Sequence, residues 1–190
     1  MGMWIFLATE VMLFGGLFCG YTVYRVLHPR AFAEASTHLY TWIGGTNTAV
    51  LLLSSFTMAM GVRSAKLLSR RATIIFLSIT VLLGLTFLGL KGLEYTLDWH
   101  DRIVPGRFFD PHGNPNPGQA EMFMIFYFIM TGLHTVHMLA AIGVMGTIAF
   151  AAARVDHMDK VKNAVEIGGL YWHFVDIVWI FLLPLLYLIK

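Results

Sequence analysis

Long apolar runs separated by short polar connections dominate the chain. Each run is near or above the roughly 20 residues that an α-helix needs to cross a bilayer. Backbone groups cannot stay unpaired in lipid, and the runs are too long and continuous for barrel strands, so they predict helices. The predicted fold is all-α, a polytopic transmembrane bundle forming a single domain over residues 1–190. Its five helices are expected at about Met3–Leu27, Tyr40–Val62, Ala72–Leu97, Met122–Ala153 and Val165–Ile189.

The distribution of Lys and Arg over the connections predicts the orientation of the chain. The connections after the second and fourth helices hold seven of these residues, against five on the opposite side. Because positive residues accumulate on the cytoplasmic side, the N-terminus is expected inside and the C-terminus outside. The longest connection, Asp98–Gln119, is rich in Pro, Gly and Asn, which predicts an outer loop.

Composition agrees with a membrane protein and restricts its partners. Hydrophobic residues make up 57% of the chain and charged residues only 13%, which indicates that lipid rather than water surrounds most of it. The net charge of +2 gives no indication of nucleic-acid binding. Cys19 is the single cysteine, so no internal disulfide can form.

The last helix carries three ionisable residues within its apolar run, Glu166, His173 and Asp176. Their spacings of seven and three residues place them on one face of an α-helix. Ionisable groups in hydrocarbon are costly, so they usually face other helices and have partners there. The sequence therefore raises the question of which helices supply those partners.

Other helices carry candidate partners. His134 and His137 are three residues apart and share a face of the fourth helix. At a rise of about 1.5 Å per residue, Glu10 and His173 each lie roughly 10 Å from the inner surface, and His137 comes to the same level. We therefore predict a shared polar layer of Glu10, His137 and His173. Glu94 is expected in the outer leaflet.

Four interpretations of these residues compete. Haem binding by His134 and His173 is disfavoured because His137 would crowd the same face. A metal-dependent enzyme using Glu10 and the three histidines is also disfavoured, since no tight motif such as His-Glu-x-x-His occurs. A proton-handling or regulatory role for Glu10 and a purely structural hydrogen-bond network are equally favoured by the residues alone.

Several motifs, in order across nearly the whole chain, closely resemble subunit III of the haem-copper oxidases, the terminal oxidases of aerobic respiration. The final motif, which contains Trp172, His173 and Asp176, is the most specific of them. The matching stretches are Thr9–Gly16, Asn47–Leu52, Leu82–Leu85, Glu94-Tyr95, Thr131–His137, Glu166 and Tyr171–Trp179.

The resemblance implies a non-catalytic subunit of a proton-pumping oxygen reductase. Such a subunit holds no redox metal: the haems and copper are expected in partner subunits. It packs against the catalytic subunit I, assembles with subunit II and other oxidase subunits, and supports proton uptake. Glu10 matches the carbodiimide-reactive glutamate of the family. The chain resembles the short five-helix form, which lacks the first two of seven helices.

The resemblance also implies the surroundings of the chain. We expect a multi-pass protein of a prokaryotic plasma membrane, the inner membrane in a Gram-negative cell, with bound phospholipid. Two alternatives stay open: a stand-alone proton or ion transporter using Glu10, and a component of a nitric oxide reductase or respiratory supercomplex. The residues expected to form a membrane-embedded polar network with possible lipid contacts are Glu94, His134, His137, Glu166, Trp172, His173 and Asp176.

Overall fold

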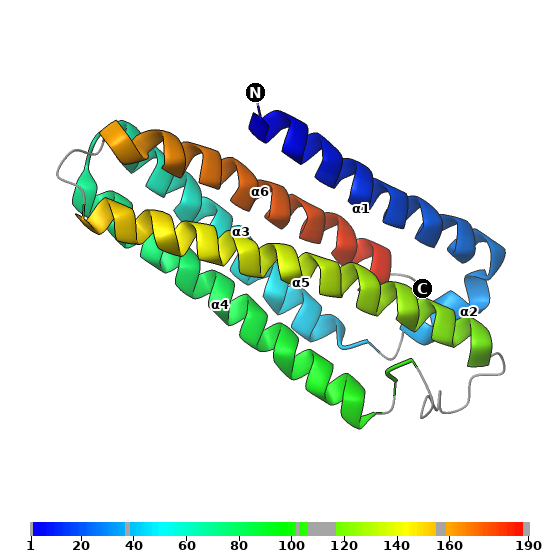
Figure 1. Cartoon of the computed structure of the whole chain (residues 1–190). Helices are drawn as coiled ribbons and strands as arrows, with labels where there is room; N and C mark the ends of the chain where they lie inside the picture. Colours follow the sequence, from blue (N-terminus) through cyan, green and yellow to red (C-terminus); the bar gives the residue numbers. More distant parts are fainter. Residues whose placement is uncertain (1, 37–38, 102, 106–116, 155–158, 188–190) are drawn as a thin grey trace. The chain divides into compact units, whose positions relative to one another are not determined.

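A computed structural model describes residues 2–36, 39–101, 103–105, 117–154 and 159–187 of the chain (Figure 1). Within these ranges the regular structure is entirely helical, which confirms the predicted all-α class. The helices are α1 (Gly2–Leu27), α2 (Pro29–Ser36), α3 (Thr41–Lys66), α4 (Arg70–His100), α5 (Pro117–Arg154) and α6 (Asp159–Tyr187).

Five of these helices, all except α2, are long and apolar enough to cross a membrane. This confirms the five predicted spans, and the chain is a multi-pass membrane protein. The orientation of the termini stays a prediction.

The helices extend beyond the apolar runs that predicted them. α3 continues to Lys66 and α4 to His100, while α5 begins at Pro117. Both ends of the predicted Asp98–Gln119 loop are therefore helical, and residues 106–116 lie outside the described part of the chain. A helix can continue past the lipid because its hydrogen bonds are internal, so the apolar boundary does not mark its end.

The short helix α2 was not predicted. It begins at Pro29, and proline suits the first position of a helix because its ring fixes φ and no N–H is needed there. Ala31 and Phe32 are buried, so α2 is held by packing rather than by its length. A search for spans of about 20 residues cannot detect a helix of eight.

The chain divides into two compact units, and α3 to α6 contribute segments to both. Unit 1 comprises Met1–Gly45, Leu90–Leu133 and Ile180–Lys190, and unit 2 comprises Thr46–Gly89 and His134–Trp179.

The core of unit 1 is aromatic where α1, α2 and α5 meet. The Tyr21 ring lies 5.6 Å from the Phe32 ring and 6.3 Å from the Phe123 ring, centroid to centroid. Tyr21 Oη also donates a hydrogen bond of 2.7 Å to the carbonyl oxygen of Leu185. The last four carbonyls of a helix lack intrahelical donors, so this bond satisfies one near the C-terminus of α6.

Small residues let the helices of unit 2 approach closely. A Cβ added to Gly84 on α4 would meet the Trp172 ring at 2.8 Å, and one on Gly169 would meet Val62 at 2.9 Å. Helix association in membranes depends on such close packing, because lipid supplies little hydrophobic driving force between helices. At one end of the unit, Arg70 Nε donates to the carbonyl oxygen of Ala152 at 3.1 Å and caps α5.

Candidate polar sites in the membrane-spanning helices

Unit 1 contains a buried group of five polar side chains, which we call the Lys91 cluster. All five are 4% exposed or less. The Lys91 Nζ atom donates to Glu94 Oε2 at 2.8 Å, to Tyr187 Oη at 2.8 Å and to Tyr127 Oη at 3.0 Å. The members of the cluster are Lys91, Glu94, Asp98, Tyr127 and Tyr187.

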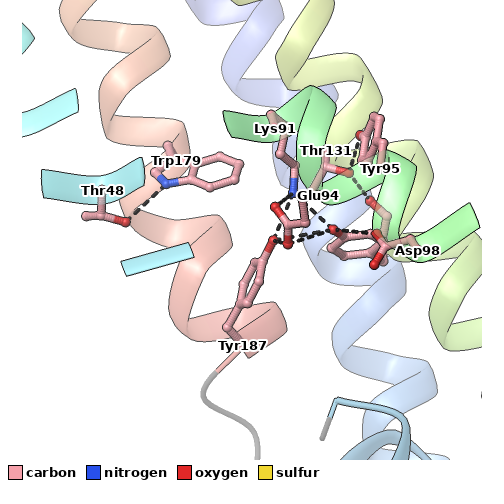
Figure 2. Close-up of polar contacts among 9 residues, drawn as sticks. Thr48, Lys91, Glu94, Tyr95, Asp98, Thr131, Trp179 and Tyr187 are labelled. Carbon is pink, nitrogen blue, oxygen red and sulfur yellow. Dashed lines mark hydrogen bonds and ion pairs between the residues drawn. The ribbon is translucent and has the colours of Figure 1, made fainter. Parts of the chain in front are cut away.

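The two phenols connect the carboxylates to the ammonium group. Figure 2 shows Tyr187 with its contacts to Lys91 and Glu94. Tyr187 Oη donates to Glu94 Oε1 at 2.5 Å, and Tyr127 Oη lies 3.1 Å from the same oxygen. Tyr127 Oη is also 3.3 Å from Asp98 Oδ2. Asp98 Oδ1 is buried and has no hydrogen-bond partner among the described residues.

Helical spacing brings the charged members of the cluster together. Lys91, Glu94 and Asp98 follow one another at three and four residues, which places them on one face of α4. The phenols come from α5 and α6. Gly44 on α3 leaves room for Tyr187, because a Cβ added there would lie 3.1 Å from the Tyr187 ring.

Sequence reasoning identified only part of this cluster. It singled out Glu94, in the same stretch as Lys91, but assigned Asp98 to a loop and gave no role to Tyr127 or Tyr187. The signal that could have extended the site is the recurrence of ionisable residues at 91, 94 and 98, which indicates one helical face.

The ionisable residues of the last helix interact with α3 in unit 2. Lys66 Nζ lies 2.8 Å from Glu166 Oε1, in a pair whose side chains are 52% and 43% exposed. His173 Nδ1 and Ser55 Oγ are 2.8 Å apart. The partner groups in these two contacts therefore come from the neighbouring α3.

Asp176 is buried in unit 2, and its carboxylate oxygens have no hydrogen bond of normal geometry among the described residues. The Ser55 hydroxyl lies near the Asp176 carboxyl group. The Asn47 side chain on α3 is likewise fully buried with neither amide atom hydrogen-bonded in the described part of the chain. A buried polar group without hydrogen bonds is costly, and a carboxyl group reduces that cost by staying neutral.

The remaining aromatic and histidine candidates of unit 2 form a packed core. Trp172 Nε1 donates to Ser54 Oγ at 3.2 Å. Trp179 Nε1 donates to Thr48 Oγ1 at 3.1 Å (Figure 2). The buried His134 ring lies 5.0 Å from the Trp179 ring, centroid to centroid. Through these contacts Trp172 and His134 pack within unit 2, and their place in the predicted polar network stays a prediction.

Glu10 and His137 are both half-buried. Glu10 belongs to unit 1, whereas His137 and His173 belong to unit 2, so the predicted layer of these three residues stays a prediction. The His137 carbonyl oxygen accepts a hydrogen bond of 3.4 Å from Tyr171 Oη. In the part of the chain that the structure describes, no three His, Cys, Asp or Glu residues are grouped as metal ligands.

Comparison with known proteins places these sites in a family context. Residues 119–189, which include α6 and most of α5, match the family model of cytochrome c oxidase subunit III. The chain is 32% identical to a probable cytochrome c oxidase subunit 3 of Nocardia farcinica, over 98% of this chain and 85% of the relative. It is 29% identical to cytochrome c oxidase subunit 3 of Thermostichus vulcanus, over 100% of this chain and 86% of the relative. The quinol oxidase subunit 3 of Bacillus subtilis is 27% identical, with 99% and 85% covered.

Proposed function

Because the chain belongs to the cytochrome c oxidase subunit III family of the haem-copper oxidases, we propose that it is a non-catalytic subunit of a respiratory haem-copper oxidase. The observation that carries this proposal is the match to a subunit 3 relative over 98% of the chain, which includes all five spanning helices. The complex reduces oxygen and pumps protons in the plasma membrane of a prokaryote. The haems and copper belong to partner subunits.

The role proposed for this chain is to stabilise subunit I and to support proton uptake. Subunit II and other oxidase subunits complete the complex. The relatives are named both as cytochrome c oxidase and as quinol oxidase subunits, so the electron donor is a separate question. The electron donor is identified by measuring oxygen consumption of the purified complex, first with reduced cytochrome c and then with a quinol.

Affinity purification from native membranes tests the proposal. The tagged chain, extracted in a mild detergent, is expected to bring with it subunits that show haem absorption in the optical spectrum. The chain expressed alone serves as the control and should contain no stoichiometric haem or copper. Recovery of the native chain without any haem protein would contradict the proposal.

A bound phospholipid is part of the proposed function. α1 has the smallest buried share of the five spanning helices, and its large apolar side chains, among them Trp4, Met12 and Val26, are exposed. An apolar helix surface of this kind must be covered by lipid or by a partner subunit. Mass spectrometry of lipid retained by the purified complex tests this point, and delipidated complex is expected to lose activity.

Glu10 is the residue proposed to act in proton uptake. It is half-buried on the helix with the most exposed surface, and a carboxyl group there can react with an apolar carbodiimide. Glu10→Gln is expected to abolish labelling and to lower proton pumping while the complex still assembles. Glu34→Gln, on the short exposed part of α2, is the matched control. Unchanged pumping in the Glu10→Gln complex would contradict this role.

A stand-alone proton or ion transporter that uses Glu10 is the alternative from a different class. It requires ion flux through the purified chain in liposomes without any partner subunit. Ion flux through the purified chain that disappears in Glu10→Gln would favour the transporter. An oxidase subunit, tested alone in the same liposomes, is expected to show no ion flux. A nitric oxide reductase or respiratory supercomplex is distinguished by the catalytic subunit that co-purifies.

A further inference from the structure

The Lys91 cluster contains more acidic groups than basic ones. Lys91 is its one cation, and Glu94 and Asp98 are its two carboxyl groups, each 1% exposed or less. With both carboxyl groups ionised, the cluster would carry a net charge of −1 away from water. Burying an uncompensated charge costs several kcal/mol in effective terms, at about the scale of a whole protein's stability. A bound proton removes that charge.

We propose that the Lys91 cluster is a proton-binding site and that Asp98 carries its exchangeable proton. The hydrogen bonds distinguish the two carboxyl groups. Glu94 accepts from Lys91 at 2.8 Å and from Tyr187 at 2.5 Å, so each of its oxygens has a strong hydrogen-bond partner. Asp98 has one contact, to Tyr127 at 3.3 Å, and its second oxygen has no partner among the described residues.

The phenol of Tyr127 links the two carboxyl groups. When Asp98 is neutral, its O–H donates to Tyr127 Oη, and the Tyr127 O–H donates to Glu94 Oε1 at 3.1 Å. When the proton leaves Asp98 for water, Tyr127 Oη can instead donate to the new carboxylate. Both states therefore have a complete hydrogen bond at this position, as a reversible site requires.

Asp98 lies two residues before the end of α4 at His100. One turn further along, Asp101 is exposed and accepts a hydrogen bond from Tyr40. The charged and titratable groups that face Asp98 are Lys91, Glu94 and Asp101 from α4 and its end, Tyr127 from α5 and Tyr187 from α6.

Every group in the site belongs to this chain, so the site can bind a proton whichever complex the chain joins. The Lys91 cluster gives the chain a reversible proton-binding site on α4, at a different position from Glu10 on α1. If Asp98 carries no exchangeable proton, the chain can still be an oxidase subunit, because the purification experiment does not depend on this site.

Isotope-edited infrared spectroscopy of the full chain in lipid nanodiscs tests the site. Aspartate labelled with ¹³C at the side-chain carboxyl moves the C=O band of a protonated aspartic acid away from that of glutamic acid. Asp176 is a second buried aspartate, so every sample carries Asp176→Asn. At neutral pH we expect such a band, sensitive to D₂O, and its loss when Asp98→Asn is added. Asp101→Asn, added instead, is the matched control and should keep the band. A band that is absent from Asp176→Asn alone, or unchanged when Asp98→Asn is added, would overturn the proposal.

One further variant tests the charge balance and needs no change at Asp98. Glu94→Gln leaves one cation and one carboxyl group, so Asp98 should ionise and its band should disappear. Retention of the Asp98 band in Glu94→Gln would also overturn the proposal. Circular dichroism of each variant checks that the helices are intact.

Discussion

The Lys91 ammonium and the Glu94 carboxylate form a salt bridge of 2.8 Å, and their side chains are 1% and 0% exposed. The chain contains a second Lys–Glu pair of the same length, Lys66 and Glu166, whose side chains are about half exposed. The two pairs share chemistry and distance and differ in burial, so they allow the effect of burial to be measured directly.

Removing one partner of the buried pair should destabilise the chain far more than removing one partner of the exposed pair. Lys91→Met leaves two carboxyl groups buried without a cation, at a cost of about 3–5 kcal/mol. Lys66→Met should cost about 0–1 kcal/mol, because water screens that pair. Unfolding of both variants in the same detergent compares these costs, and equal losses would contradict the role given to burial.

Filling the space at Gly84 should also destabilise unit 2. A Cβ there would lie 2.8 Å from the Trp172 ring and 3.1 Å from Ile142, so a rigid indole must shift. Gly84→Ala is expected to cost about 1–3 kcal/mol, as overpacking does elsewhere. Gly89→Ala on the same helix meets nothing within 4 Å and should be neutral or stabilising by up to about 1 kcal/mol. The account would be contradicted if thermal unfolding showed that Gly84→Ala and Gly89→Ala both lower the stability of the chain, or both raise it.

Tyr21 holds the end of α6 through a single hydrogen bond. Tyr21→Phe keeps the ring among Phe32 and Phe123 and removes only the bond to the Leu185 carbonyl. We expect a loss of about 1 kcal/mol and faster amide exchange near the end of α6. Tyr24→Phe is the control, because Tyr24 packs on Phe126 and is partly exposed. Unchanged exchange in Tyr21→Phe would show that the bond does not restrain the helix.

The exposed pair of Tyr40 and Asp101 predicts a pH-dependent interaction. Tyr40 Oη donates to Asp101 Oδ2 at 2.9 Å, and this hydrogen bond, together with repulsion from the carboxylate, raises the pKa of Tyr40 above 10.0. A raised pKa means that the contribution to stability is complete below the ordinary pKa and is lost as the pH rises through the raised one. Ultraviolet titration, taken as the difference from Tyr40→Phe, should show the pKa fall in Asp101→Asn. Asp159→Asn should leave it unchanged.

The order and number of the spanning helices could be predicted from the sequence because each depends on a local property. An apolar run of sufficient length must become a helix in lipid, whatever its neighbours are. The apolar pattern does not predict the structure at Asp98 or at α2. Asp98 is polar and precedes a Pro- and Gly-rich stretch, yet it is helical and buried. The eight residues of α2 are held by packing that hydropathy does not record.

For the polar sites too, the sequence indicated which residues share a helical face but not which residues contact one another. Spacing alone placed Glu166, His173 and Asp176 on one helical face, and Glu94 was expected in the outer leaflet. It did not select Lys66 and Ser55 as the partners of Glu166 and His173, or Tyr127 and Tyr187 as the phenols around Glu94.

By itself, the sequence determined that this protein has five membrane-spanning helices, which faces carry its ionisable groups, and to which family it is similar. Only the tertiary structure decided which of those groups meet. A partner is fixed by how far each helix is rotated and shifted against its neighbour, and those two quantities arise from side-chain packing between segments distant in the chain. Lys91 and Tyr187 are 96 residues apart, and no local pattern connects them.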